Sequence, residues 1–106
     1  MKVDYQSMLS QIKQNVQEVD PTAQVWLYGS RAKGNAREDS DWDVLVLSSK
    51  ESLSVKEESL FIDHICDLMV KTGQAIQLFA YGIKDWHTRH SITPFYKSVQ
   101  SEAIQL

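Results

Sequence analysis

A polar, turn-rich segment at residues 29–41 lies between two strand-like runs, and this feature limits the possible folds of the chain most strongly. In residues 23–28, small and aliphatic side chains alternate with amide and aromatic ones, which is typical of a strand with two different faces. Residues 42–47 are mostly apolar and include two β-branched valines, which predicts a strand buried on both faces. The chain is therefore expected to contain a sheet, with a polar connection between two of its strands.

Helical patterns precede and follow these two strands. Apolar residues recur at helical spacing from Tyr5 to Val19, and the first helix ends before Pro21 because a residue that precedes proline avoids the helical conformation. Ser54 and Glu57 form a capping box that begins a long helix, which stops at Gly73. A third strand, a short helix and a last helix opened by Thr93-Pro94 are expected at residues 75–81, 84–90 and 94–103.

Helices that alternate with strands in this way predict the α/β class (or α+β): a small mixed sheet flanked by helices. The length of 106 residues allows one domain, residues 1–106. A chain of this size has no room for a second domain that would hold a bulky substrate. Any large substrate is therefore expected to be presented from outside the chain.

Charge and hydropathy exclude several functional classes. Eleven Lys and Arg against 14 Asp and Glu give a net charge of −3, so no sequence-wide basic field attracts nucleic acid or anionic lipid. No apolar run approaches the ~20 residues that span a bilayer, and the N-terminus lacks the apolar stretch of a signal peptide. The single cysteine, Cys66, cannot form an internal disulfide and is expected to be a small core residue. These features predict a cytoplasmic protein that acts away from membranes.

Two aspartates at the start of the second strand are the first candidates for chemistry. Side chains alternate along a strand, so Asp41 and Asp43 project to one face while Trp42 points to the other. Two carboxylates held this close repel each other unless they share a proton or a cation. Mg²⁺ prefers carboxylate oxygens together with substrate phosphates. The pair therefore predicts a metal site for a nucleotide, provided that a phosphate-binding turn lies beside it.

Gly29 and Ser30 supply such a turn at the end of the first strand. Glycine lets the backbone approach a phosphate closely, the amides at the start of a following helix favour anions, and the Ser30 hydroxyl adds a donor. Arg31 and Lys33 follow immediately and are predicted to be secondary phosphate contacts, since a triphosphate needs compensating positive charge.

Other motifs fit this sequence poorly. The spacing from Gly29 to Gly34 matches a P-loop, but Asn35 stands where the lysine is required, and no GxGxxG dinucleotide motif is present. An EF-hand loop that begins at Asp39 would have valine and lysine where it needs glycine and glutamate. His87 and His90 have a spacing that suits zinc, but no further ligands accompany them, so a packing or surface role is expected.

The order of these residues resembles a known signature. Gly29-Ser30, ten residues and then Asp41-x-Asp43 is similar to the signature of the polymerase-beta-like nucleotidyltransferase superfamily, and the length resembles its minimal members. The resemblance covers nearly the whole chain. It implies a nucleotidyltransferase-like fold, in which Gly29 and Ser30 hold the triphosphate and Asp41 and Asp43 are the catalytic, Mg²⁺-binding residues. The implied reaction is attack of an acceptor hydroxyl on the α-phosphate of a nucleoside triphosphate, most simply ATP, with pyrophosphate leaving.

The resemblance also implies a partner. Minimal members of this kind are often encoded beside a small helical protein of the HEPN type, and some act as antitoxins that adenylylate a tyrosine of that protein. The acceptor is accordingly expected on a partner protein or on another subunit of a homo-oligomer.

One departure from the family pattern bears on catalysis. The family usually draws a third carboxylate from the next strand, where it completes a two-metal site and takes a proton from the acceptor. Residues 74–81 contain no acid, and Gln77 is the only polar residue in the middle of that strand. An amide cannot accept a proton as a carboxylate does, and Asp85 lies past the strand, where we expect it to cap a helix. Two functions follow: a nucleotidyltransferase, or a catalytically impaired module of the same fold that binds a helical partner as an antitoxin does.

Overall fold

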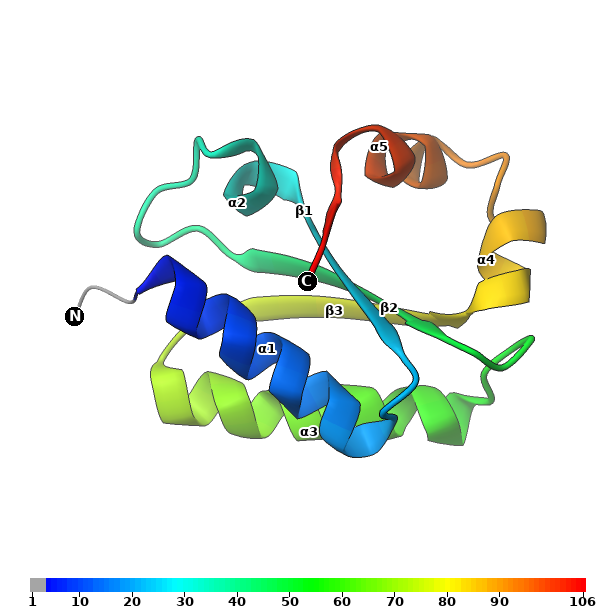
Figure 1. Ribbon diagram of the computed structural model, residues 1–106, viewed down its shortest axis with the longest axis horizontal. Coiled ribbons are helices and arrows are strands. Elements are labelled where there is room, and N and C mark those ends of the chain that lie inside the picture. The colour runs from blue at the N-terminus through cyan, green and yellow to red at the C-terminus, as the bar shows by residue number, and fades with distance from the viewer. Residues whose placement is uncertain (1–3) are drawn as a thin grey trace.

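The computed structural model describes residues 4–106. Residues 1–3, part of the N-terminal segment expected to lack a signal peptide, lie outside the described residues. Figure 1 shows a sheet with helices on both sides, which confirms the predicted mixed α+β class. In chain order the elements are α1 (Tyr5–Val19), β1 (Gln24–Tyr28), α2 (Gly29–Lys33), β2 (Trp42–Ser48), α3 (Val55–Thr72), β3 (Ile76–Gly82), α4 (Ile83–Thr88), α5 (Pro94–Glu102) and β4 (Ile104–Gln105).

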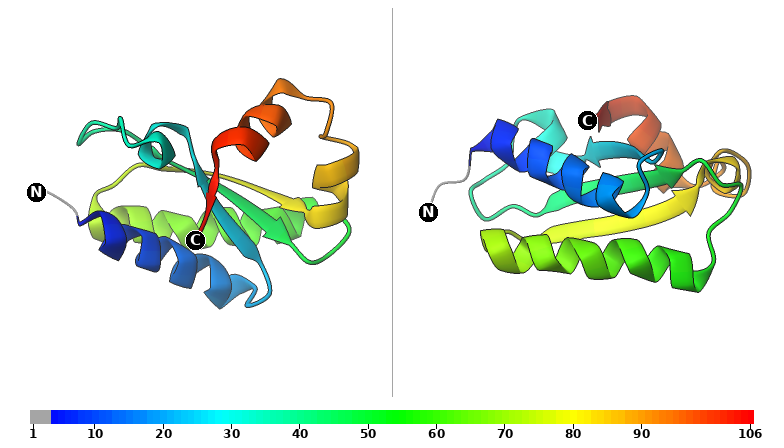
Figure 2. Two further views of the ribbon diagram at one scale, coloured as in Figure 1. Left: turned by 45° about the horizontal axis from the view of Figure 1, so that its top comes forward. Right: turned by 60° about the horizontal axis from the view of Figure 1, so that its bottom comes forward.

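The four strands form one sheet in the order β3-β2-β1-β4. β1 pairs antiparallel with both β2 and β4, while β2 and β3 run parallel. The parallel pair requires a crossover, and α3 provides it by running alongside β3 (Figure 2). β3 and β4 are therefore the two edges of the sheet.

Two buried clusters hold helices to the two faces of this sheet. The larger cluster lies between α1, α3 and one face, and Val44 and Val46 of β2 contribute to it. The smaller cluster lies on the opposite face, where Leu45 and Leu47 of β2 pack with Trp86 of α4 and Val99 of α5. Consecutive residues of β2 thus enter different clusters, which confirms that this strand is buried on both faces.

The N-termini of α3 and α5 are capped as the sequence predicts. The Ser54 hydroxyl accepts from the Glu57 backbone N–H at 3.1 Å, and the Glu57 carboxylate accepts from the Ser54 N–H at 3.0 Å, so the capping box of α3 is complete. The hydroxyl of Thr93 accepts from the N–H of Tyr96 at 3.1 Å and caps α5. These caps satisfy amides that the first helical turn leaves without a backbone partner.

Two expectations about individual residues are wrong, and one strand was not expected. Cys66 is exposed rather than buried, because the buried stripe of α3 is formed by Phe61, Ile65 and Leu68 and the cysteine lies off that stripe. Asp85 does not cap α4: the cap position is Gly82, and Asp85 lies inside the first turn. The strand β4, which no sequence pattern predicted, pairs with β1 on the side that faces away from β2. Between residues 4 and 106, no helix is both long and apolar enough to cross a bilayer.

Candidate active site

The two halves of the predicted motif meet at one end of the sheet. The antiparallel register pairs Tyr28, the last residue of β1, with Asp43 near the start of β2. Gly29 directly follows β1 and has a left-handed φ of +72°. A Cβ at Gly29 would lie 2.3 Å from Oδ2 of Asp43, so a side chain there would overlap the carboxylate. The turn and the carboxylate therefore pack together in a way that only glycine allows.

The turn continues directly into the short helix α2, which begins at Gly29. No side chain caps this helix at Tyr28. The first amides of a helix have no partner within the helix, so they can donate to another acceptor. Together with the half-buried Ser30, these amides place hydrogen-bond donors beside an acidic group.

The two aspartates differ in environment. Asp41 is exposed, whereas Asp43 is partly buried at the start of β2. Burial, and secondly the negative charge of Asp41, raise the pKa of the Asp43 carboxyl above its ordinary value. A cation between the two carboxylates would remove this repulsion, and paired carboxylate oxygens suit a hard divalent ion. In residues 4–106, however, no third acid, histidine or cysteine joins them to form a group of three metal ligands.

The neighbouring strand β3 shows why only two carboxylates, Asp41 and Asp43, are available at the site. In the parallel register of β2 and β3, Asp43 is paired with Gln77, so these two side chains project from the same face. An exposed amide thus occupies the place beside Asp43 from which a third carboxylate could reach the site. Asp85 cannot take its place, because it lies beyond the far end of β3, where its carboxylate faces Arg89 at 3.4 Å.

Arg31, the first of the two predicted phosphate contacts, lies in a position that its place in the sequence does not indicate. The Arg31 Nη2 donates to the backbone carbonyls of Glu38 at 3.1 Å and Ser40 at 2.9 Å. Its guanidinium carbon lies 4.2 Å from the centre of the Trp42 ring, on the face of β2 opposite to Asp43. Arg31 therefore braces the loop that leads into β2, and its contact with phosphate stays a prediction.

Lys33 is engaged with the last helix. Its Nζ lies 3.0 Å from Oε2 of Glu102, at the end of α5. The Lys33 ammonium, together with a hydrogen bond from Ser98, lowers the pKa of the Glu102 carboxyl. Because both side chains of the pair remain partly exposed, the ammonium can exchange one anionic partner for another.

Aromatic side chains that the motif did not include flank the aspartates. Tyr28 meets Phe95 of α5 edge to face at 5.3 Å, and Phe95 meets Phe79 of β3 at 5.6 Å. Burial, followed by the charge of Asp43, raises the pKa of the Tyr28 hydroxyl. Phe79 lies two residues after Gln77 and so shares its face, which strand alternation could have indicated. No sequence pattern indicated Phe95, because it comes from a distant helix.

The two histidines have packing roles. The His87 Nδ1 lies 2.8 Å from the Tyr96 hydroxyl, and the His90 ring packs against Tyr81 with ring centres 4.4 Å apart. These contacts, made by an exposed His87 and a half-buried His90, agree with the expected packing or surface role.

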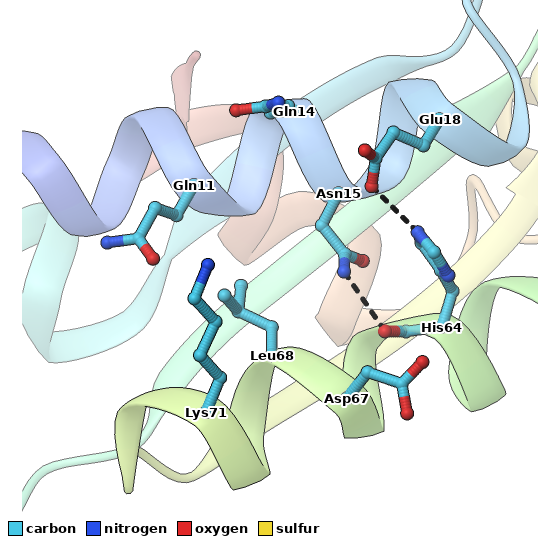
Figure 3. Close-up of a pocket in the computed structure, with 8 residues that line it drawn as sticks. All are labelled: Gln11, Gln14, Asn15, Glu18, His64, Asp67, Leu68 and Lys71. Carbon is cyan, nitrogen blue, oxygen red and sulfur yellow. Dashed lines mark hydrogen bonds and ion pairs between the residues drawn. The ribbon is translucent and has the colours of Figure 1, made fainter.

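A separate groove runs between α1 and α3, on the face of the sheet opposite to the aspartates. Figure 3 shows its polar lining, in which Asn15 donates to the His64 carbonyl at 3.0 Å and the His64 ring lies 2.8 Å from Glu18. It has a volume of about 210 Å³, and none of the predicted site residues lines it. The groove is therefore not part of the candidate active site.

Comparison with known proteins identifies a family model that matches most of the chain. The family model described as "Polymerase beta, Nucleotidyltransferase" matches residues 10–101, a range that includes the turn, the aspartates and Gln77. The chain belongs to this nucleotidyltransferase family. No curated protein matches the chain by sequence.

Solved structures share the fold of this chain. A structure named as a minimal nucleotidyltransferase is 22% identical, with a TM-score of 0.65, and the match covers 98% of this chain and 97% of that one. A toxin–antitoxin structure with AMP-PNP is 16% identical, with a TM-score of 0.66 and coverage of 91% and 69%. A mutant of the toxin–antitoxin MntA–HpeT is 15% identical, with a TM-score of 0.66 and coverage of 97% and 72%.

Proposed function

We propose that this chain binds a Mg²⁺–nucleoside triphosphate, most simply ATP, and transfers the nucleotidyl group to a hydroxyl of a partner protein. The observation that carries the proposal is the packing of Gly29 against the Asp43 carboxylate, with no room for a Cβ between them. This packing brings the backbone donors of the turn, which suit phosphate, next to the carboxylates, which suit a cation. A metal-bound triphosphate requires both kinds of group at adjacent positions.

Each of the predicted site residues has a defined task in this proposal. Gly29 and Ser30 would donate to the triphosphate, and Asp41 and Asp43 would hold a divalent cation, whose charge would compensate that of the phosphates. Lys33 adds positive charge if it turns from Glu102 to the triphosphate. Arg31 acts on phosphate less directly, because its guanidinium holds the loop before Asp41 in place.

The acceptor comes from outside the chain in this proposal. The exposed Asp41 and Gln77 leave one side of the site open to an approaching hydroxyl. Two of the structures that share this fold are toxin–antitoxin structures, one of them with an ATP analogue, which supports both a protein partner and ATP as the nucleotide. A small helical protein of the HEPN type is the partner that we propose, with a tyrosine hydroxyl as the acceptor.

A second function is favoured by Gln77. Because an amide lies beside Asp43, the chain has no carboxylate at this position to take the proton of the acceptor. Under this alternative the chain keeps the fold and the partner surface, and it works as an antitoxin-like binding module without transferring a nucleotide.

Calorimetry with Mg²⁺ and ATP tests the nucleotide site. We expect the wild type to bind Mg²⁺–ATP and the double variant Asp41→Asn with Asp43→Asn to lose this binding. The matched control is Asp63→Asn with Asp67→Asn, which removes the same charge from exposed positions of α3 on the opposite face of the sheet. Unchanged affinity in the Asp41 and Asp43 double variant would overturn the proposal.

Covalent labelling separates the two functions. A partner that co-purifies with the chain is incubated with ATP carrying a labelled α-phosphate. Label on the partner that appears with the wild type and not with the Asp41 and Asp43 double variant would remove the binding-module alternative. A stable complex without label transfer would favour that alternative.

A further inference from the structure

The strand register limits how many cations the site can hold. Asp43 and Gln77 are direct neighbours across β2 and β3, and they project from the same face. A cation placed at Asp41 and Asp43 therefore has a neutral amide at the position where a third carboxylate would complete the ligands of a second ion.

Charge counting leads to the same limit. Two divalent cations bring four positive charges to within about 4 Å of each other. Asp41 and Asp43 supply two negative charges, and within residues 4–106 no other acid belongs to a metal-ligand group with them. Arg31 and Lys33, the two cationic residues that follow the turn, supply no negative charge that could hold a second ion. The phosphates of the nucleotide can compensate the ion that they accompany, but a second ion would depend on the protein.

We propose that the site holds a single divalent cation, the one that accompanies the triphosphate, and that Gln77 is the residue that excludes a second. This inference rests on the proposed function, since it concerns the cation of that site. It has a chemical consequence for transfer: neither a second metal ion nor a carboxylate of β3 activates the acceptor hydroxyl. The group that takes the acceptor proton then belongs to the partner or is water.

Counting bound Mn²⁺ tests the inference without any measurement of turnover. Mn²⁺ replaces Mg²⁺ because its electron paramagnetic resonance signal reports free and bound ions, and a non-hydrolysable ATP analogue at saturation prevents reaction. We expect one Mn²⁺ per bound nucleotide in the wild type and two in Gln77→Asp, where dipolar broadening should show that the ions are close together. Gln77→Glu provides a second variant in case the shorter acid disturbs the edge strand.

The control is Gln14→Asp, which adds the same charge on α1, on the other face of the sheet, and should keep one Mn²⁺ per nucleotide. Circular dichroism confirms that each variant is folded before ions are counted. Two ions in the wild type would overturn the inference and leave the proposed function standing. One ion in both folded acid variants would overturn the assignment to Gln77. Absence of Mn²⁺-dependent nucleotide binding in the wild type would overturn the proposed function itself, and the inference with it.

Discussion

Replacing Gly29 with alanine tests whether the contact between the turn and Asp43 assembles the site. Two costs arise at this position. The backbone has a φ of +72°, a region in which an L-residue costs roughly 1–2 kcal/mol. In addition, the new Cβ would lie 2.3 Å from Oδ2 and 3.2 Å from Cγ of Asp43, so the carboxyl group must rotate away.

Gly34 provides the matched comparison. Its φ is +78°, close to that of Gly29, but among residues 4–106 a Cβ there would have no neighbour within 4 Å. Gly34→Ala should therefore show the backbone cost alone, about 1–2 kcal/mol, while Gly29→Ala adds about 0.5–1.5 kcal/mol for the displaced Asp43 side chain. Both variants restrict the unfolded chain equally, so that effect cancels in the comparison.

Urea denaturation and calorimetry measure the two consequences. We expect Gly29→Ala to be less stable than Gly34→Ala by this difference, and to lose at least about tenfold in Mg²⁺–ATP affinity because one charged ligand is moved. In an Asp43→Ala background the extra stability cost of Gly29→Ala should disappear, since the clashing atoms are gone. Equal stability of the two glycine variants, together with unchanged nucleotide affinity in Gly29→Ala, would refute the reasoning.

Three further predictions concern charges around the site. Because the pKa of Asp43 is raised, the folded state binds the carboxyl proton more tightly than the unfolded state does. The free energy of unfolding without metal should therefore fall as pH rises from about 3.8 through the pKa of the folded state. Asp43→Asn should remove this fall, as measured by urea titrations at several pH values. Glu102→Gln should free Lys33 and raise Mg²⁺–ATP affinity a few-fold, whereas Lys33→Gln should lower it, with calorimetry showing opposite signs. Arg31→Lys should loosen the loop before β2, because an ammonium cannot reproduce the guanidinium fork, and hydrogen exchange at residues 35–41 should accelerate.

Local patterns predicted the parts of the site that depend on strand geometry. Alternation in β1 and β2 was enough to place Asp43 on one face and Trp42 on the other, and the structure buries Trp42 to 1% exposure. The same rule identified Gln77 as the polar residue of β3, but only the pairing of the strands shows that it lies beside Asp43. Periodicity thus predicts the face of the sheet from which a side chain projects. The residue beside it on the next strand depends on the register of the two strands.

Features that depend on contacts between distant segments could not be predicted in this way. The direction of Arg31 is set by two loop carbonyls and by the Trp42 ring, none of which is implied by its place after Ser30. β4 is two residues long, too short for any period to appear, and it exists because β1 has a free side to pair with. For Cys66, residue type suggested burial, but the phase of α3 relative to its buried stripe decided the outcome.

Because β3 lies at the edge of the sheet, a partner can reach the position beside Asp43 at which the chain has no third carboxylate. β3 is an edge strand, and it carries Gln77 beside Asp43 and the 39% exposed Phe79 two residues later on the same face. The place of the third carboxylate therefore lies at the border of the sheet, where an approaching protein can reach it. If the proposed function holds, we expect the partner to insert both its hydroxyl and a proton acceptor at this border. An isolated chain should then bind nucleotide without transferring it to a free hydroxyl compound, and Gln77→Asp should gain such transfer, because it restores a proton acceptor on the chain itself.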